Sequence, residues 1–254
     1  IISCYPIHPE VFERLYDDWS TLENFQRTRG VLRFMAKVIH ELWSKNDDNA
    51  LIMPGTLPFY ESHVNEELIS SLEGKDAWNG VIAGDIDGDN SIPYRRDTAG
   101  SSRFKNVSAC RKAARTVMLG SAPSVRGQSV RGIERSRILL GAVQPGDNIS
   151  VFNDALNELK NELSFMYSDA SGNMYWFDTR PTLQKQVRDR EGQIRENEIQ
   201  HEIISRLKDN AKRKGLFAGI FVCPKNDGFD VPDDKQGLRL VILGPDAGNG
   251  ENAE

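Results

Sequence analysis

The sequence predicts a mainly α-helical chain with a small β component, an α+β fold. Apolar residues recur at three- and four-residue steps along most of the chain, which is the period of a helix. A short segment near residue 170 has two strand-like runs around a Gly-containing turn, which predicts one β-hairpin. Residues 216–222 and 238–243 are nearly continuous apolar runs of strand length, typical of buried strands in a parallel sheet.

Composition and charge exclude several classes of protein. The chain has 254 residues, 39% of them hydrophobic and 27% charged, which is the range of ordinary globular proteins with one or two cores. The net charge of −5 gives no overall case for a binder of nucleic acid or membrane, although local basic patches remain compatible with it. No apolar run reaches the roughly 20 residues that a membrane-spanning helix needs.

The cysteines and the N-terminus indicate a cytoplasmic origin and a longer parent protein. Cys4, Cys110 and Cys223 are far apart and lack the spacing of a zinc site, and an odd number favours a reducing compartment. The chain begins at Ile1 without the pattern of a signal peptide. We therefore expect a cytoplasmic fragment of a larger protein.

Residues 1–73 predict a helical subdomain built around an amphipathic helix over residues 24–43. Helices over residues 10–18, opening at Pro9, and 58–73 flank it. The apolar face of the central helix is expected to contain Val31, Leu32, Met35, Val38, Ile39 and Leu42.

Arg27, Arg29 and Arg33 lie at or near the first turn of this helix, around Gly30. Positive charge there opposes the helix macrodipole, and a bound anion would offset that cost. The alternative is that the three arginines are solvated or are paired with nearby acids, namely Asp17, Asp18 and Glu23.

Residues 74–102 predict a loop-rich connector because Gly, Asp, Asn and Ser dominate it. Residues 85–90 suggest a calcium loop at first sight. Counted from Asp85, however, the sixth and twelfth positions hold Asn90 and Arg96 where an EF-hand needs Gly and Glu. We interpret this segment as an acidic turn.

Residues 103–180 predict a winged helix-turn-helix. Helices are expected over 107–119, 133–140 and 149–163, followed by hairpin strands over 163–167 and 174–177. The third helix, in the recognition position, is acidic, which argues against reading of DNA bases by that helix.

Residues 95–137 contain eleven Lys or Arg against two acids. This basic segment has three interpretations: contact with a DNA backbone, contact with a neighbouring subunit or partner domain, or plain solvation. The candidate contact residues are Arg103, Lys105, Arg111, Lys112, Arg115, Arg126 and Arg131.

Residues 181–254 predict a long helix and the start of an α/β domain. Thr182 is a suitable cap for a helix over 183–214, and two apolar strands follow it. Two strands cannot form an independent sheet, so this module is expected to continue further or to join another sheet.

A search for catalytic motifs finds none. The phosphate-binding loop pattern, the dinucleotide fingerprint, the zinc-protease motif and the serine nucleophile elbow are all missing, and the four histidines are dispersed. Whether the parent is an enzyme stays open at this point, but catalysis by this chain alone is not expected, and no metal site is expected.

Residues 30–33, Gly-Val-Leu-Arg, are similar to the Gly-x-x-Arg opening of a helix in the lid domain of AAA+ ATPases. Longer segments of the chain, given in the next sentence but one, resemble a family of large predicted prokaryotic AAA+ ATPases of unknown function. Members of this family are often encoded beside adenine-specific DNA methyltransferases. The resemblance covers nearly the whole chain and rests on residues 5–10, 19–22, 25–33, 119–123, 175–182 and 240–245.

The resemblance implies that this chain is the non-catalytic lid and winged-helix region of such an ATPase. Arg33, with Arg29 and Arg27 as alternates, would then sense the nucleotide phosphates, while ATP and Mg²⁺ would be bound mainly by a preceding part of the parent chain, where the missing Walker motifs would lie. Implied partners are the rest of that ATPase, further copies in a homo-oligomer, DNA and a DNA methyltransferase, with a role in restriction, methylation or phage defence. No membrane is implied.

A second interpretation, from another class, is an ATP-independent scaffold that binds a DNA methyltransferase or nuclease. The acidic third helix and the mixed charges of the long helix favour it. A DNA-binding transcription regulator is a third interpretation, and the acidic recognition position counts against it.

Overall fold

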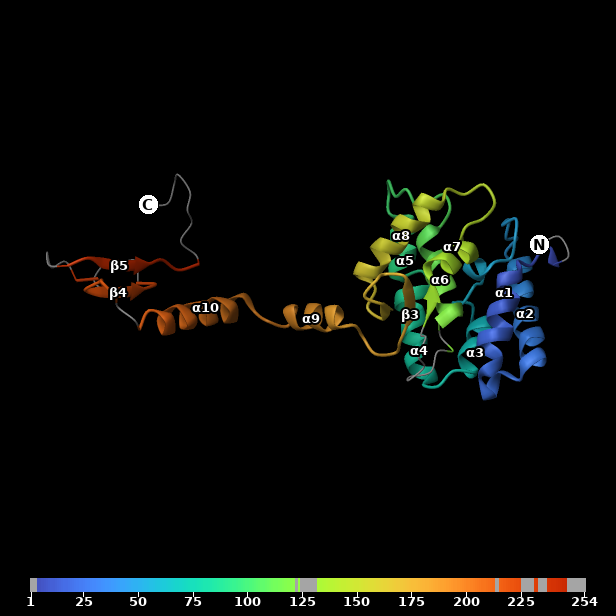
Figure 1. Ribbon diagram of the computed structural model, residues 1–254, viewed down its shortest axis with the longest axis horizontal. Helices are drawn as coiled ribbons and strands as arrows, with labels where there is room; N and C mark the ends of the chain where they lie inside the picture. Colours follow the sequence, from blue (N-terminus) through green and yellow to red (C-terminus); the bar gives the residue numbers. More distant parts are fainter. Residues whose placement is uncertain are drawn as a thin grey trace. The chain divides into compact units, whose positions relative to one another are not determined.

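The computed structural model describes residues 4–121, 123, 132–212, 215–224, 231–232 and 237–245 (Figure 1). The chain forms two compact units, Ile1–Gln186 and Val187–Glu254. Helices dominate and the strands are short, so the predicted α+β class is confirmed. Within the described ranges, no helix is long and apolar enough to cross a membrane.

The first unit opens with the helix predicted at Pro9. Helix α1 (Pro9–Glu13) has His8 as its N-cap, and the Nδ1 atom of His8 accepts a hydrogen bond from the Glu10 amide at 3.1 Å. The helix continues as a π-helical turn, η2 (Arg14–Asp18), and a 3-10 turn, η3 (Trp19–Thr21). The buried indole of Trp19 donates to the Leu119 carbonyl at 2.7 Å, which ties this segment to the centre of the unit.

Helix α2 (Arg27–Ser44) follows the short turn η4 (Glu23–Phe25) and matches the predicted central helix. Its buried face is rotated from the predicted one: Phe34 is buried, whereas Leu32 and Ile39 are exposed. The prediction was wrong here because α2 carries two overlapping apolar stripes, and periodicity alone does not say which one faces the core.

Residues 74–102 are mostly helical, which corrects the predicted loop-rich connector. After η5 (Pro54–Thr56) and α3 (Ser62–Ser70), the chain forms α4 (Lys75–Val81), the π-helical turn η6 (Ile82–Ile86) and α5 (Ile92–Thr98). Burial of four apolar side chains outweighs the turn-forming composition of the segment. These side chains are Trp78, Val81, Ile82 and Ile86.

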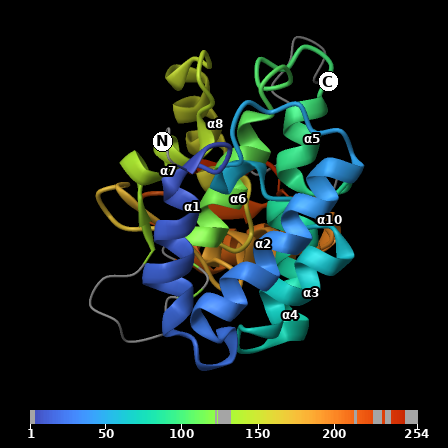
Figure 2. The same cartoon turned by 90° about the vertical axis from the view of Figure 1, so that its right-hand side faces the viewer.

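Helix α6 (Ala109–Ser121) lies in the middle of the unit and packs against α5, α7, α8, η5 and β3 (Figure 2). The elements that follow it are β1 (Ile133–Glu134), α7 (Arg135–Ala142), α8 (Ile149–Glu162), β2 (Met166–Ser168) and β3 (Met174–Phe177). The three predicted helices and the predicted hairpin are therefore present. Strand β1, only two residues long, was not predicted.

The three strands form an antiparallel sheet in the order β1-β3-β2. Ile133 faces Tyr175, and Met166 faces Phe177. Most helical segments of the first unit contribute side chains to one hydrophobic cluster. The predicted divisions at residues 73 and 102 stay predictions, and the boundary between the two units lies close to the predicted boundary at residue 180.

Helix α9 (Leu183–Glu191) begins in the first unit, and the second unit contains α10 (Glu196–Asn210), β4 (Gly219–Val222) and β5 (Arg239–Ile242). The predicted single helix over 183–214 is thus divided, because Gly192, a poor helix former, is followed by turns up to Arg195. Strands β4 and β5 pair in parallel as predicted. They are only half-buried, and no described residue of this unit is fully buried, because two strands and one helix cannot enclose a core.

Candidate functional site

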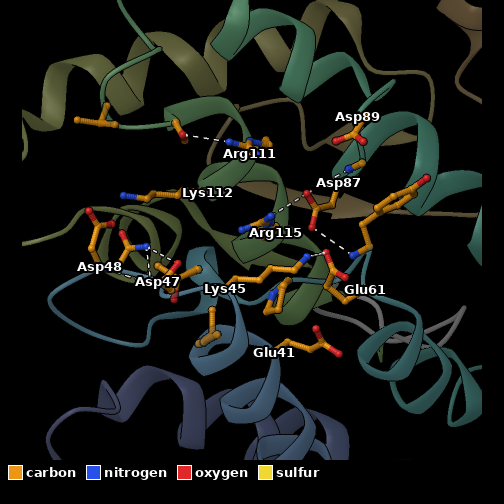
Figure 3. Close-up of a pocket in the computed structure, with 18 of the residues that line it drawn as sticks. Glu41, Lys45, Asp47, Asp48, Glu61, Asp87, Asp89, Arg111, Lys112 and Arg115 are labelled. Atoms are coloured by element: carbon orange, nitrogen blue, oxygen red, sulfur yellow. Dashed lines mark hydrogen bonds and ion pairs between the residues drawn. The ribbon is translucent and has the colours of Figure 1, made fainter.

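Three of the predicted contact residues, Arg111, Lys112 and Arg115, meet in one cavity of about 460 Å³ in the first unit (Figure 3). The walls come from the end of α2 and the residues after it, from η5 and the residues after it, from the turn after η6, and from the start of α6 and the residues before it. The other charged residues of the wall are Lys45, Glu41, Asp47, Asp48, Glu61, Asp87 and Asp89.

Asp97 fixes the start of α6 and hence the direction of these three side chains. Its carboxylate accepts hydrogen bonds from the amides of Cys110 at 2.9 Å and Arg111 at 3.0 Å, which satisfies two of the unpaired N–H groups at the helix start. Burial raises the pKa of Asp97, and those amides and the Arg111 guanidinium oppose the rise. A buried acid from α5 therefore orients the basic residues of α6.

Arg115 joins three segments that are far apart in the sequence. Its Nη2 lies 2.7 Å from Asp87 Oδ1, and the other Asp87 oxygen accepts from the Tyr60 amide at 3.2 Å. The Arg115 side chain is 15% exposed and that of Asp87 is 4% exposed, so this ion pair is mostly removed from water. Gly55 lets η5 approach α6 at this point, because a Cβ atom there would lie 2.8 Å from the Lys112 carbonyl oxygen.

Lys112 and Arg111 also have acidic neighbours. The Lys112 ammonium is 3.9 Å from Asp147 Oδ2, and its side chain is 12% exposed. Burial lowers the pKa of Lys112, and Asp147 opposes this decrease. The Arg111 guanidinium lies 5.0 Å from the centre of the Tyr94 ring and 3.5 Å from Asp97. The four cations of the cavity wall face six acids, so the cavity has mixed charge and does not favour a polyanion.

Two further predicted contact residues, Arg103 and Lys105, do not line this cavity. Arg103 lies 2.8 Å from Asp154 and 3.8 Å from Glu158 on α8, and 5.1 Å from the centre of the Phe104 ring. Lys105 is exposed. Arg126 and Arg131 lie outside the residues that the structure describes. The acidic face of α8 is thus partly neutralised by Arg103, and by Arg96, which pairs with Glu162.

The second predicted site, at the start of α2, is also built as a charge cluster. Arg33 Nε pairs with Glu67 Oε1 of α3, and Lys37 Nζ lies 2.7 Å from the other oxygen of the same carboxylate. Burial opposes ionisation of Glu67, but Lys37 and Arg33 together hold its pKa below the ordinary value. Arg27 and Arg29 are exposed and form no ion pair with any residue that the structure describes.

Gly30 is required where it stands in α2. A Cβ atom at this position would lie 1.6 Å from the carbonyl oxygen of Phe25. Phe25 is itself fully buried and packs 5.7 Å from the Trp19 ring. This close approach sets where α2 begins, and with it the position of Arg33.

The segment interpreted above as an acidic turn, residues 85–90, has a structural role. No group that could hold a metal ion occurs among the described residues. Asp85 accepts a hydrogen bond from the Phe165 amide at 2.7 Å, and burial raises the pKa of Asp85 to about 6. Sequence reasoning missed the roles of Asp85, Asp87 and Glu67. Their partners are 27 to 80 residues away, and no local pattern indicates such pairs.

The comparisons with known proteins agree with the extent of the first unit. A family model described as the DUF499 second domain matches residues 1–177, from the N-terminal segment to the end of β3. The search of curated proteins gave no match, and the search of solved structures gave none either.

Proposed function

Because this chain belongs to the DUF499 family through its second domain, we propose that it is a non-catalytic, nucleotide-responsive part of a larger AAA+ ATPase. Arg33 contacts the phosphates of ATP that, with Mg²⁺, is held by another part of the parent protein. Hydrolysis changes that contact, and α2 passes the change to the helices packed on it. The proposal includes a cytoplasmic location and a role in restriction, methylation or phage defence.

The observation that carries this proposal is the excess of positive charge beside Glu67. Arg29, Arg33 and Lys37 follow one another at four-residue steps, so they lie along one edge of α2. Of these, Arg33 and Lys37 pair with the single carboxylate of Glu67. A phosphate group is a stronger acceptor for a guanidinium than a shared carboxylate is, so it would compete for Arg33, whose side chain is 43% exposed.

The part of the chain that α2 would move is a winged helix-turn-helix in this proposal. The order of its elements, α6–β1–α7–α8–β2–β3, supports that fold. Its order and its β1-β3-β2 sheet are those of a winged helix, and η2, packed between α2 and α6, connects the two parts. The internal pairing of Arg103, Arg111 and Arg115 favours a protein rather than DNA as its target. A DNA backbone contact would then depend on Lys105, Arg126 and Arg131.

The test is ATP turnover by the full-length parent protein carrying Arg33→Ala. Removing one charged contact to transferring phosphate is expected to lower kcat at least tenfold. Arg95→Ala, an exposed arginine on α5, serves as the control and should leave kcat unchanged. Unchanged turnover in Arg33→Ala, with the melting temperature of the parent preserved, refutes the assignment of Arg33.

A second candidate function is an ATP-independent scaffold for a DNA methyltransferase or a nuclease. The pairing of Arg103 with Asp154 and Glu158 favours it, because α8 then presents a neutralised surface of the kind found in protein contacts. Co-purification from the native host with and without ATP separates the two functions. A scaffold keeps its partner in both conditions, whereas a nucleotide-responsive module gains or loses the partner with ATP.

A further inference from the structure

Helix α2 has an apolar stripe that faces away from the core of the first unit. We call Leu32, Ala36, Ile39 and Trp43 the outer stripe. Leu32 is 66% exposed, Ile39 44% and Trp43 83%, and Ala36 is also exposed. Figure 2 shows α2 at the surface of the first unit, beside α1 and α3. A row of large exposed apolar side chains on one helix is unusual for a surface that contacts only water.

The spacing of the outer stripe is that of a helix–helix seam. Its residues are separated by four, three and four positions, the pattern with which two helices interdigitate in a coiled coil. The small side chain of Ala36 near the middle allows close approach of a second helix, and the bulky Trp43 lies at one end. We propose that two copies of this chain associate through their outer stripes, with the two α2 helices antiparallel.

The antiparallel direction follows from the shape of the stripe. A two-fold axis between residues 37 and 38 places Leu32 of one copy against Trp43 of the other, and Ala36 against Ile39. Each large side chain then faces a smaller one, as close packing requires. A parallel pair would put Trp43 on Trp43 and leave a gap at Ala36.

The charges at the two ends of α2 complement each other in the same direction. The first turn of α2 contains Arg29 and no acidic residue, whereas its last turn has no basic residue and is followed by Asp47 and Asp48. In a single chain, the positive charge at the start of α2 and the negative charges after its end therefore both oppose the helix macrodipole. In an antiparallel pair, Arg29 of one copy lies beside Asp47 and Asp48 of the other, and all three side chains are exposed in the single chain.

One helix from each copy makes a small interface, so we expect a reversible dimer with a micromolar dissociation constant. The outer stripe is separate from the contact of Arg33 with Glu67, and this inference does not depend on the proposed function. Failure of the ATP turnover test would leave it unchanged.

The test is sedimentation velocity of the 254-residue chain over a range of concentrations. The mass is expected to rise from 28.6 kDa toward twice that value. Trp43→Ser and Ile39→Ser should each raise the dissociation constant at least tenfold. Leu140→Ser, on α7, is the matched control because Leu140 is 45% exposed, and it should leave the dimer intact. A wild-type chain that stays monomeric, or a dimer that both stripe variants retain, overturns the proposal.

Cross-linking tests the direction of pairing. In a background with Cys4 and Cys223 replaced by Ser, mixed Arg29→Cys and Asp47→Cys chains are expected to form disulfide-linked heterodimers. The remaining Cys110 is buried. Efficient linkage between two Arg29→Cys chains, without heterodimers in the mixture, indicates a parallel pair and overturns the antiparallel arrangement.

Discussion

Replacing Asp85 with Asn should remove a specific pH dependence from the stability of the first unit. Asp85 is 2% exposed, and its carboxylate joins the end of the π-helical turn η6 to the segment before β2 through the Phe165 amide. Burial raises its pKa from 3.8 to about 6, and the hydrogen bonds of the Phe165 and Ser164 amides oppose that rise. The folded chain therefore holds the Asp85 proton more tightly than the unfolded chain does.

The sign and size of the effect follow from that difference in pKa. Because the folded pKa is the higher one, this stabilising contribution is complete below pH 3.8 and is lost as the pH rises to about 6. A difference of about two units corresponds to about 3 kcal/mol in total. Between pH 4.5 and 7.5, linkage predicts a loss of about 2 kcal/mol from this group alone. The side-chain amide of the Asp85→Asn variant cannot titrate, so the variant lacks this loss.

Urea unfolding followed by tryptophan fluorescence provides the assay, because all four tryptophans lie in the first unit. The compared quantity is the free energy of unfolding of Asp85→Asn minus that of the wild type. This difference should be about 2 kcal/mol more positive at pH 7.5 than at pH 4.5. Asp89→Asn, an exposed aspartate from the same turn, is the control and should show no such change. A difference that does not vary with pH refutes the reasoning about Asp85.

Two further predictions concern packing around the charge clusters. Gly30→Ala should lower the free energy of unfolding by more than about 2 kcal/mol, because the new Cβ atom meets the Phe25 carbonyl, and Gly80→Ala, which has open space, should not. Urea titration of both variants checks this, and equal stability would contradict it. Arg115→Met and Asp87→Asn should each cost about 3–5 kcal/mol, whereas the double variant should cost clearly less than their sum. Additive costs in that double-mutant cycle would show that the two side chains do not interact.

Local signals predicted most of the helices. Pro9 at the start of α1 and the apolar periodicities of α2, α6 and α8 are properties of short segments, and these elements appear close to the predicted residues. The parallel pairing of β4 and β5 was also predictable, because continuous apolar strands are typical of parallel sheets. Strand β1 was not, since two residues are too few to show a period.

The candidate sites were harder to predict because they depend on distant pairs. The sequence places eleven basic residues in residues 95–137 and suggests a basic surface. In the fold, Asp87, Asp97 and Asp147 lie beside Arg115, Arg111 and Lys112. Asp87 and Asp97 come from residues 74–102, which the sequence analysis predicted to be a loop-rich connector. The charge of a segment is therefore a poor guide to the charge of the surface it forms.

Helix α2 shows how one sequence pattern can present three different faces. Its core face packs into the first unit, its edge with Arg33 and Lys37 faces Glu67, and its outer stripe is exposed. Leu32 and Arg33 are neighbours in the sequence and belong to two different faces. Movement of α2 after Arg33 leaves Glu67 for a phosphate would also move the outer stripe, because both lie on the same helix. If both proposals hold, ATP binding and pairing of two chains are coupled, and the dissociation constant of the dimer should depend on ATP in the parent protein but not in an Arg33→Ala variant.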